Sequence, residues 1–271
     1  MSASEKGSEA LFDLDDLKKN TARLDVSGID FATFGDQPLS AGGLRCLRYM
    51  HDVEYHTVCY MRDLLVTKAH QDHEIASFLT FWCFEEYWHG EAIGQVLKAH
   101  EEGAHAERVQ PLRARIRRRE AFKPWLHSLG SMIAGREWLA VHMTWGAVNE
   151  WSTQAGYARL IAAERHPVLT DLLKRIMRQE GRHIDFYATH ARAALASSGR
   201  AQRLVRFALE RAWSPVGAGV MPAEEVDHLT RFLFTGSDGM AAAQRIDRQI
   251  DRLPGLGGLS LLERSITARA A

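Results

Sequence analysis

Four long segments of this chain carry apolar residues at three- and four-residue steps, and each apolar stripe has a glutamate at its centre. This spacing places the apolar side chains on one face of an α-helix, the face that packs into a core. The predicted helices span residues 40–68, 73–101, 123–164 and 166–197. The glutamates on their buried faces are Glu54, Glu86, Glu150 and Glu180. Any fold built from these helices must accommodate four carboxylates in its core.

No alternating strand pattern persists and only 7 prolines occur in 271 residues, so we expect an all-α protein. Four helices with inward carboxylates predict a ferritin-like four-helix bundle over residues 40–200, with a long crossover at 103–122. Residues 1–39 form an N-terminal arm with a short helix near 9–20. Residues 201–271 form a C-terminal helical extension packed on the bundle, with helices near 202–213, 223–234 and 241–253, within one domain.

Composition excludes several classes of function. The 34 Lys and Arg balance the 34 Asp and Glu, which disfavours nucleic-acid binding. Charge-free stretches of about a dozen residues fall short of the roughly 20 that cross a bilayer, so we expect no membrane span. The polar, acidic N-terminus lacks the pattern of a secretory signal, which predicts a cytoplasmic location. Cys46, Cys59 and Cys83 contain no C-x-x-C, so we expect no iron–sulfur site and an external electron donor.

Two of the four central glutamates are followed by histidine three residues later, as Glu86/His89 and Glu180/His183. Residues at this spacing share a helical face, so both side chains can reach one metal ion. Glu85 points about 100° away from Glu86, so spacing assigns Glu86 as the ligand. Uncompensated carboxylates in a core cost several kcal/mol each and repel one another, and carboxylate with imidazole suits iron or manganese. The alternative to a metal site is that these side chains are buried polar groups whose hydrogen bonds are all made within the core.

The Glu-x-x-His pattern occurs four times, but only two copies belong to a repeat. Glu54 precedes Glu86 by 32 residues, and Glu150 precedes Glu180 by 30. The remaining copies, Glu102/His105 and Glu225/His228, have no such upstream glutamate and are interpreted as surface residues. The repeat predicts two iron ions, with manganese as an alternative, held by Glu54, Glu86, His89, Glu150, Glu180 and His183.

These strings resemble the soluble acyl-[acyl-carrier-protein] desaturases of the ferritin-like di-iron carboxylate superfamily. The sequence EEYWHG at 85–90 is similar to that family's E-E-N-R-H-G, and QEGRH at 179–183 to its D-E-K-R-H. EWST at 150–153 resembles its E-R-A-T, and the resemblance gives Thr153 a role in oxygen handling. It also implies O₂ as co-substrate, a donor such as ferredoxin, an acyl carrier protein as partner and a homodimer. Trp88 and Gln179 depart from the family's arginine and aspartate, and an amide at 179 still hydrogen-bonds without adding charge.

The resemblance favours an O₂-dependent oxidase that abstracts hydrogen from an acyl chain or related apolar substrate. Alternatives on the same scaffold are a hydroxylase or N-oxygenase of a small metabolite, and an oxidase like the ribonucleotide reductase small subunit, with Tyr55, Tyr87 and Tyr187 as radical candidates. A ferritin-type ferroxidase is disfavoured because cage ferritins generally lack the second Glu-x-x-His. A metal-free helical interaction protein is a further alternative.

Two other groups have both a structural and a functional interpretation. A basic cluster in the crossover is either a solvated helix face or a docking site for an acidic carrier protein. Its members are Arg113, Arg115, Arg117, Arg118 and Arg119. The second group consists of aromatic residues near the ligands, which either pack in the core or line a substrate channel. Its members are Trp82, Phe84, Tyr87, Trp145, Trp151, Tyr157, Phe186 and Tyr187.

Overall fold

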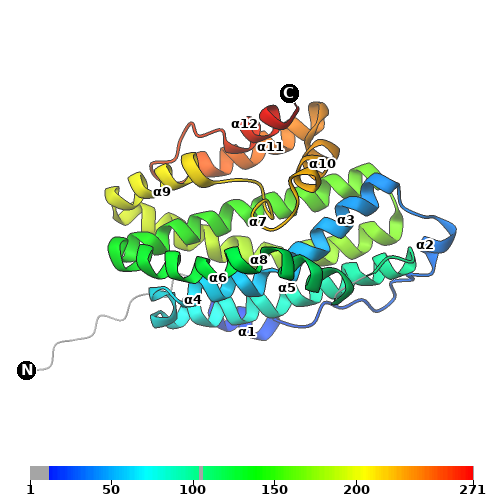
Figure 1. Ribbon diagram of the computed structural model, residues 1–271, viewed down its shortest axis with the longest axis horizontal. Helices are drawn as coiled ribbons and strands as arrows, with labels where there is room; N and C mark the ends of the chain where they lie inside the picture. Colours follow the sequence, from blue (N-terminus) through cyan, green and yellow to red (C-terminus); the bar gives the residue numbers. More distant parts are fainter. Residues whose placement is uncertain (1–11, 104–105, 271) are drawn as a thin grey trace, which may run out of the picture.

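The computed structural model describes residues 12–103 and 106–270, and all regular structure in these residues is helical (Figure 1). The all-α prediction is therefore confirmed for this part of the chain. Long helices run side by side along the molecule. They are α3 (Ala41–Glu54), α4 (Thr57–Leu65), α5 (His73–Ala99), α6 (Ala106–Ala134), α7 (Arg136–Glu164) and α8 (Pro167–Ser197).

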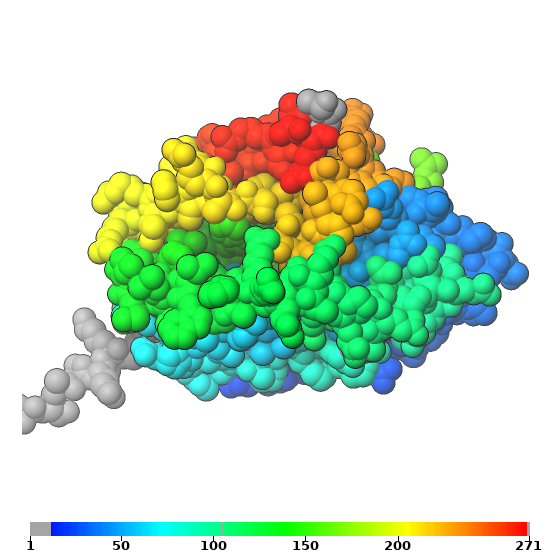
Figure 2. Space-filling model, viewed as in Figure 1, coloured from blue at the N-terminus to red at the C-terminus, as the bar shows by residue number. Residues whose placement is uncertain are grey.

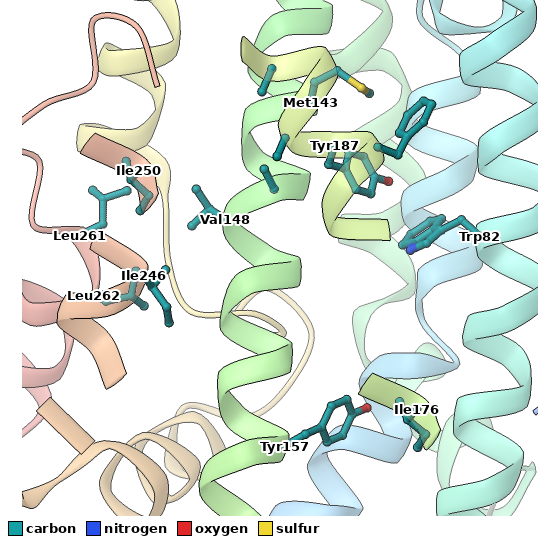
Figure 3. Close-up of a cluster of buried hydrophobic side chains, with 14 of the residues drawn as sticks. Trp82, Met143, Val148, Tyr157, Ile176, Tyr187, Ile246, Ile250, Leu261 and Leu262 are labelled. Atoms are coloured by element: carbon teal, nitrogen blue, oxygen red, sulfur yellow. The ribbon is translucent and has the colours of Figure 1, made fainter. Parts of the chain in front are cut away.

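Two helix pairs form the core. α3 packs against α5, α7 packs against α8, and the pairs meet where α5 contacts α8 and α3 contacts α7. α7 is buried on more than one side, since side chains pack against both of its flanks (Figure 3). One group comprises Trp82, Tyr157, Ile176 and Tyr187, and the other comprises Ile246, Ile250, Leu261 and Leu262.

The first predicted helix is interrupted. Instead of one helix over 40–68, α3 ends at Glu54 and α4 begins at Thr57, with a turn between them. The Thr57 hydroxyl donates to the Glu54 carbonyl at 2.6 Å, and Arg113 donates to the Tyr55 carbonyl at 2.7 Å. Side chains thus satisfy backbone groups that lose helical partners at the break. The interruption directly follows a predicted metal ligand.

The predicted start of the third helix at residue 123 is wrong. Most of the predicted crossover belongs to α6, which continues through Pro124 to Ala134. The break comes at Gly135, whose φ of 63° lies in the left-handed region that favours glycine. Pro124 does not end α6, and the connection between α5 and α7 is itself a long helix.

Shorter elements cover the core. On the N-terminal side they are α1 (Leu14–Asn20), α2 (Thr33–Asp36) and the 3₁₀ helix η1 (Lys68–Gln71), all in contact with α5. Residues 9–11 of the predicted first helix lie outside the described residues. The C-terminal side has α9 (Gly199–Ala212), α10 (Ala223–Phe234), α11 (Gly236–Asp251) and α12 (Leu261–Ala270), of which α12 was not predicted. α9 and α11 pack on α7, and α10 packs on α3.

Among the described helices, none combines the length and the apolar composition needed to cross a membrane.

Two glycines inside helices have opposite roles in packing. A Cβ at Gly146 of α7 would overlap the Tyr187 ring, whereas a Cβ at Gly181 of α8 would meet nothing within 4 Å. We expect Gly146→Ala to lower the free energy of unfolding by about 1–3 kcal/mol because the ring must move. Gly181→Ala should raise it by roughly 0.5–1 kcal/mol through helix propensity. Urea unfolding followed by circular dichroism tests both, and equal effects would contradict the packing described.

Candidate metal centre

The structure brings all six predicted ligands together. Glu54 is the last residue of α3, Glu86 and His89 lie on α5, Glu150 on α7, and Glu180 and His183 on α8. Each is at most 6% exposed. Their ligand-type atoms form two overlapping groups, with the atoms of each group within 4.8 Å of one another. One group is Glu54, Glu86, His89 and Glu180, and the other is Glu86, Glu150, Glu180 and His183.

Glu86 and Glu180 belong to both groups, and each group also has one glutamate and one histidine of its own, so Glu86 and Glu180 would be shared if each group held an ion. His183 Nδ1 lies 2.9 Å from Glu180 Oε2 and 3.1 Å from Glu86 Oε1. His89 Nδ1 lies 3.4 Å from Glu180 Oε1. Each Glu-x-x-His pair therefore contributes to both groups, and the two ion positions lie between the helix pairs.

The outer nitrogen of each histidine has a fixed partner. His89 Nε2 lies 2.9 Å from Gln179 Oε1, and the Gln179 amide nitrogen donates to the Ala22 carbonyl at 3.0 Å. This second bond orients the amide so that its oxygen faces the imidazole. An oxygen acceptor at Nε2 requires the proton there, which leaves the Nδ1 lone pair for a metal ion. Gln179 thus makes the hydrogen bond expected of it despite its lack of charge.

Glu85 is the partner of the outer nitrogen of His183, a role that its position in the sequence was not expected to give it. Glu85 is fully buried, its Oε2 lies 2.8 Å from His183 Nε2, and its Oε1 accepts from Arg182 at 2.5 Å. Spacing correctly excluded Glu85 from the two ligand groups but gave it no other role. The missed signal is its position in the repeat, since Glu85 precedes Glu86 as Gln179 precedes Glu180.

Neutral donors hold the two outer carboxylates. The Trp82 indole N–H donates to Glu150 Oε1 at 3.1 Å, and the Tyr157 hydroxyl donates to Glu54 Oε1. Both aromatic residues appeared in the predicted group near the ligands, without these roles. Each bond fixes one carboxylate oxygen without adding a positive charge to the cluster.

The four carboxylates of the cluster outnumber its two imidazoles, and no Lys or Arg of the described residues pairs with them. Burial and repulsion from neighbouring carboxylates raise the pKa of Glu54 and of Glu150 well above the usual range. Burial opposes protonation of His89, but the nearby carboxylates of Glu180 and Glu86 raise its pKa to about 9. Glu180 Oε1 and His89 Nδ1 are buried without a hydrogen bond among the described residues. Metal ions at these positions would supply the missing charge, so the donor set fits two divalent cations.

A third group, His56, Cys59 and Glu120, has spacing compatible with a metal ion. Its carboxylate is already compensated, however, because Glu120 accepts from Arg62 at 3.0 Å and pairs with Lys123. The pair with Arg62 connects α4 to α6, and the two ion pairs together leave little net negative charge for a further cation.

The two Glu-x-x-His copies outside the repeat, Glu102/His105 and Glu225/His228, contribute none of their described residues to either ligand group. Glu102 pairs with Arg48 at 2.6 Å and Glu225 pairs with Arg45 at 2.8 Å. The ring of His228 lies 3.2 Å from the Gly42 carbonyl, and His105 is outside the described residues.

A cavity of about 460 Å³ reaches the cluster. Glu54, Glu86, Glu150 and Thr153 line it on one side. Its other walls combine Tyr60, Trp82, Trp138, Trp145 and Tyr187 with His56, Asp63, Lys123, His127, His142 and Asn149. Glu54 and Thr153 also line an apolar cavity of about 70 Å³, so Thr153 lies between two cavities.

Not all of the predicted aromatic group lies near this cavity. Phe84 and Tyr87 are 45% and 41% exposed, and neither lines it. Phe186 instead stacks on Phe78 in the core, with ring centroids 3.6 Å apart.

Three of the five clustered arginines are bound to the protein's own backbone. Arg113 donates to the Tyr55 carbonyl, Arg115 to the Val220 carbonyl at 2.8 Å, and Arg119 to the Gly219 carbonyl at 3.2 Å. These bonds hold α6 against the rest of the molecule, a structural role that neither interpretation of the cluster anticipated.

Comparison with family models, with curated proteins and with solved structures finds no match to this chain.

Shared and unshared ligands predict different losses of metal. Glu180→Ala removes a ligand from both groups, so we expect neither ion to bind tightly. Glu54→Ala removes a ligand from one group, so we expect about one ion per chain to remain. Anaerobic Fe²⁺ titration with metal analysis measures this, with Glu225→Ala as a control that keeps two ions. Equal loss in the Glu180 and Glu54 variants would contradict the bridging geometry.

Glu85 should affect metal binding without being a ligand. Glu85→Gln keeps a hydrogen-bond acceptor but leaves Arg182 without its carboxylate, so we expect metal affinity to fall about 10–100-fold. The same titration tests this, and a Glu91→Gln variant on the same helix serves as control. Unchanged affinity would show that His183 needs no charged partner.

Proposed function

We propose that this chain is an O₂-dependent di-iron oxidase built on a ferritin-like bundle. The observation that carries the proposal is the opening of a buried carboxylate and histidine cluster onto a cavity beside Thr153. A storage site needs only a path for ions, whereas an oxidase needs space for a substrate next to the metal. Iron fits the proposal because it binds carboxylate and imidazole ligands and changes its oxidation state.

Bound iron would supply the redox chemistry, activating O₂ once two electrons have arrived. The protein's own residues would position and shield the reactants. Trp82 and Tyr157 hold the outer carboxylates, while Glu85 and Gln179 hold the histidines. Thr153 lines both cavities, as Glu54 does, so its hydroxyl is a suitable donor of a proton or hydrogen bond during oxygen handling. An external donor such as ferredoxin would provide the electrons.

The first candidate reaction is desaturation of an acyl chain delivered by an acyl carrier protein. The ligand strings that resemble the desaturases support it, and the tryptophan and tyrosine side chains in the cavity would shield the reacting C–H from water. Only Arg117 and Arg118 of the basic cluster lack a backbone carbonyl partner among the hydrogen bonds described, so a carrier would depend mainly on them.

A second candidate is hydroxylation or N-oxygenation of a small metabolite. The polar residues in the cavity wall favour it, because Asp63, His127 and Asn149 offer hydrogen bonds that a hydrocarbon cannot use. Burial lowers the pKa of His142 to about 3, so this wall offers a neutral imidazole to a substrate.

The decisive experiment measures O₂ uptake by protein loaded anaerobically with two Fe²⁺ and then mixed with oxygen and reductant. We expect sustained uptake in the wild type, about one-tenth or less in Glu180→Ala, and substrate-dependent product by mass spectrometry. Thr153→Val keeps the shape but not the hydroxyl, and should lower product formed per O₂ with metal content unchanged. Palmitoyl carrier protein and small aromatic amines are the two substrate classes to compare.

Two results would count against the proposal. Uptake of many iron ions per chain, with each Fe²⁺ oxidised once, would indicate a ferroxidase. A metal-loaded protein that consumes no O₂ in the presence of reductant would exclude an oxidase.

A stable tyrosyl radical would instead favour the alternative that resembles the ribonucleotide reductase small subunit.

A further inference from the structure

The C-terminal half of α6 exposes six large apolar side chains on the molecular surface. They are Phe122, Trp125, Leu126, Leu129, Met132 and Ile133, with exposed fractions from 53% to 78%. This set is called the α6 stripe below. The helix runs along the outside of the molecule, where it forms much of the green surface in Figure 2.

The six positions follow the three- and four-residue spacing of one helical face, so they form a continuous strip. The polar side chains of the same helix face the protein instead. Glu120 accepts from Arg62, His127 lies 3.2 Å from His142, and the Ser131 hydroxyl accepts from the Lys68 backbone at 3.1 Å. α6 thus has the reverse of the polarity expected for a surface helix, which normally turns its apolar face inward.

This polarity leaves a patch too large to be incidental. The two aromatic side chains of the stripe can bury roughly 150–250 Å² each, and with four other apolar side chains that are more than half exposed the stripe offers several hundred Å². Monomeric proteins rarely expose larger patches than about 300–600 Å². A stable complex of standard size buries about 800 Å² per partner, so the stripe would form the apolar centre of such an interface and the residues around it the remainder.

We propose that the α6 stripe is the interface between two copies of this chain, paired antiparallel about a two-fold axis. In a two-fold interface the same surface meets itself, so an apolar strip is its own complement. Pairing about the centre of the stripe places Leu126 of one copy against Leu129 of the other, and Phe122 against Ile133. No Lys, Arg, Asp or Glu occurs between residues 124 and 135, so the pairing brings no like charges together.

A bilayer surface is the main alternative occupant, and the charges do not favour it. Helices that lie on membranes carry Lys and Arg on the polar face, beside the apolar side chains that enter the lipid. Residues 124–135, which carry five of the six stripe side chains, contain no Lys or Arg. Lys123 pairs with Glu120, and the exposed Arg117 and Arg118 lie only beyond the N-terminal end of the stripe. The interface between copies also requires no metal, so it stands independently of the proposed function.

The proposal is tested by placing a charge in the stripe and measuring the dimer by analytical ultracentrifugation of the full chain. We expect a wild-type dimer, and dissociation constants raised by on the order of 100-fold or more in Leu126→Glu and Met132→Glu. The matched control is Phe207→Glu on α9, which is 61% exposed and lies outside the stripe, and should leave the dimer intact. Because all three side chains are exposed, unchanged circular dichroism should accompany each substitution.

Cross-linking tests the register. A cysteine at Leu126 or Leu129, next to the axis, should form an intermolecular disulfide under mild oxidation, whereas one at Phe207 should not. A monomeric wild type, or a dimer unaffected by the stripe variants, would overturn the proposal. Binding of a monomeric wild type to vesicles of phosphatidylcholine and phosphatidylserine, lost in Leu126→Glu, would assign the stripe to a membrane instead.

Discussion

Mutual repulsion among four buried carboxylates is the constraint on which the rest of this structure depends. Each of the central glutamates is nearly inaccessible to solvent, and no Lys or Arg of the described residues pairs with any of them. The guanidinium of Arg182 pairs with Glu85, which belongs to neither ligand group. Burying such charges without compensation costs several kcal/mol per group. The helix pairs are stable together only if protons or metal ions occupy the space between them.

The polar groups around the cluster hold its side chains in place without neutralising them. Trp82 and Tyr157 each give one hydrogen bond to a carboxylate, and Gln179 and Glu85 each accept one from a histidine. These bonds fix the ligands in position while leaving the negative charge of the centre for the ions. The carboxylate at Glu85 and the amide at Gln179 break the symmetry of the repeat, so the two ion positions differ in their surroundings.

The sequence predicted the helical class and the grouping of all six ligand candidates, because glutamate on an apolar helical stripe is costly and therefore informative. It did not predict the break after Glu54, since Tyr55 and His56 continue a helical pattern and the bonds that stabilise the turn come from Thr57 and distant Arg113. It misplaced the start of the third helix because Pro124 is tolerated inside α6. The partner of His183 was missed because Glu85 lies off the stripe, and only the folded arrangement brings it across to α8.

The bond between Arg113 and the Tyr55 carbonyl has a mechanical consequence. Arg113 belongs to α6, and Tyr55 directly follows Glu54 at the interruption between α3 and α4. Force applied to the outer helix therefore reaches the end of α3 through one hydrogen bond and one peptide unit. A displacement of α6 at the surface of the molecule would therefore also displace Glu54, at one edge of the carboxylate cluster.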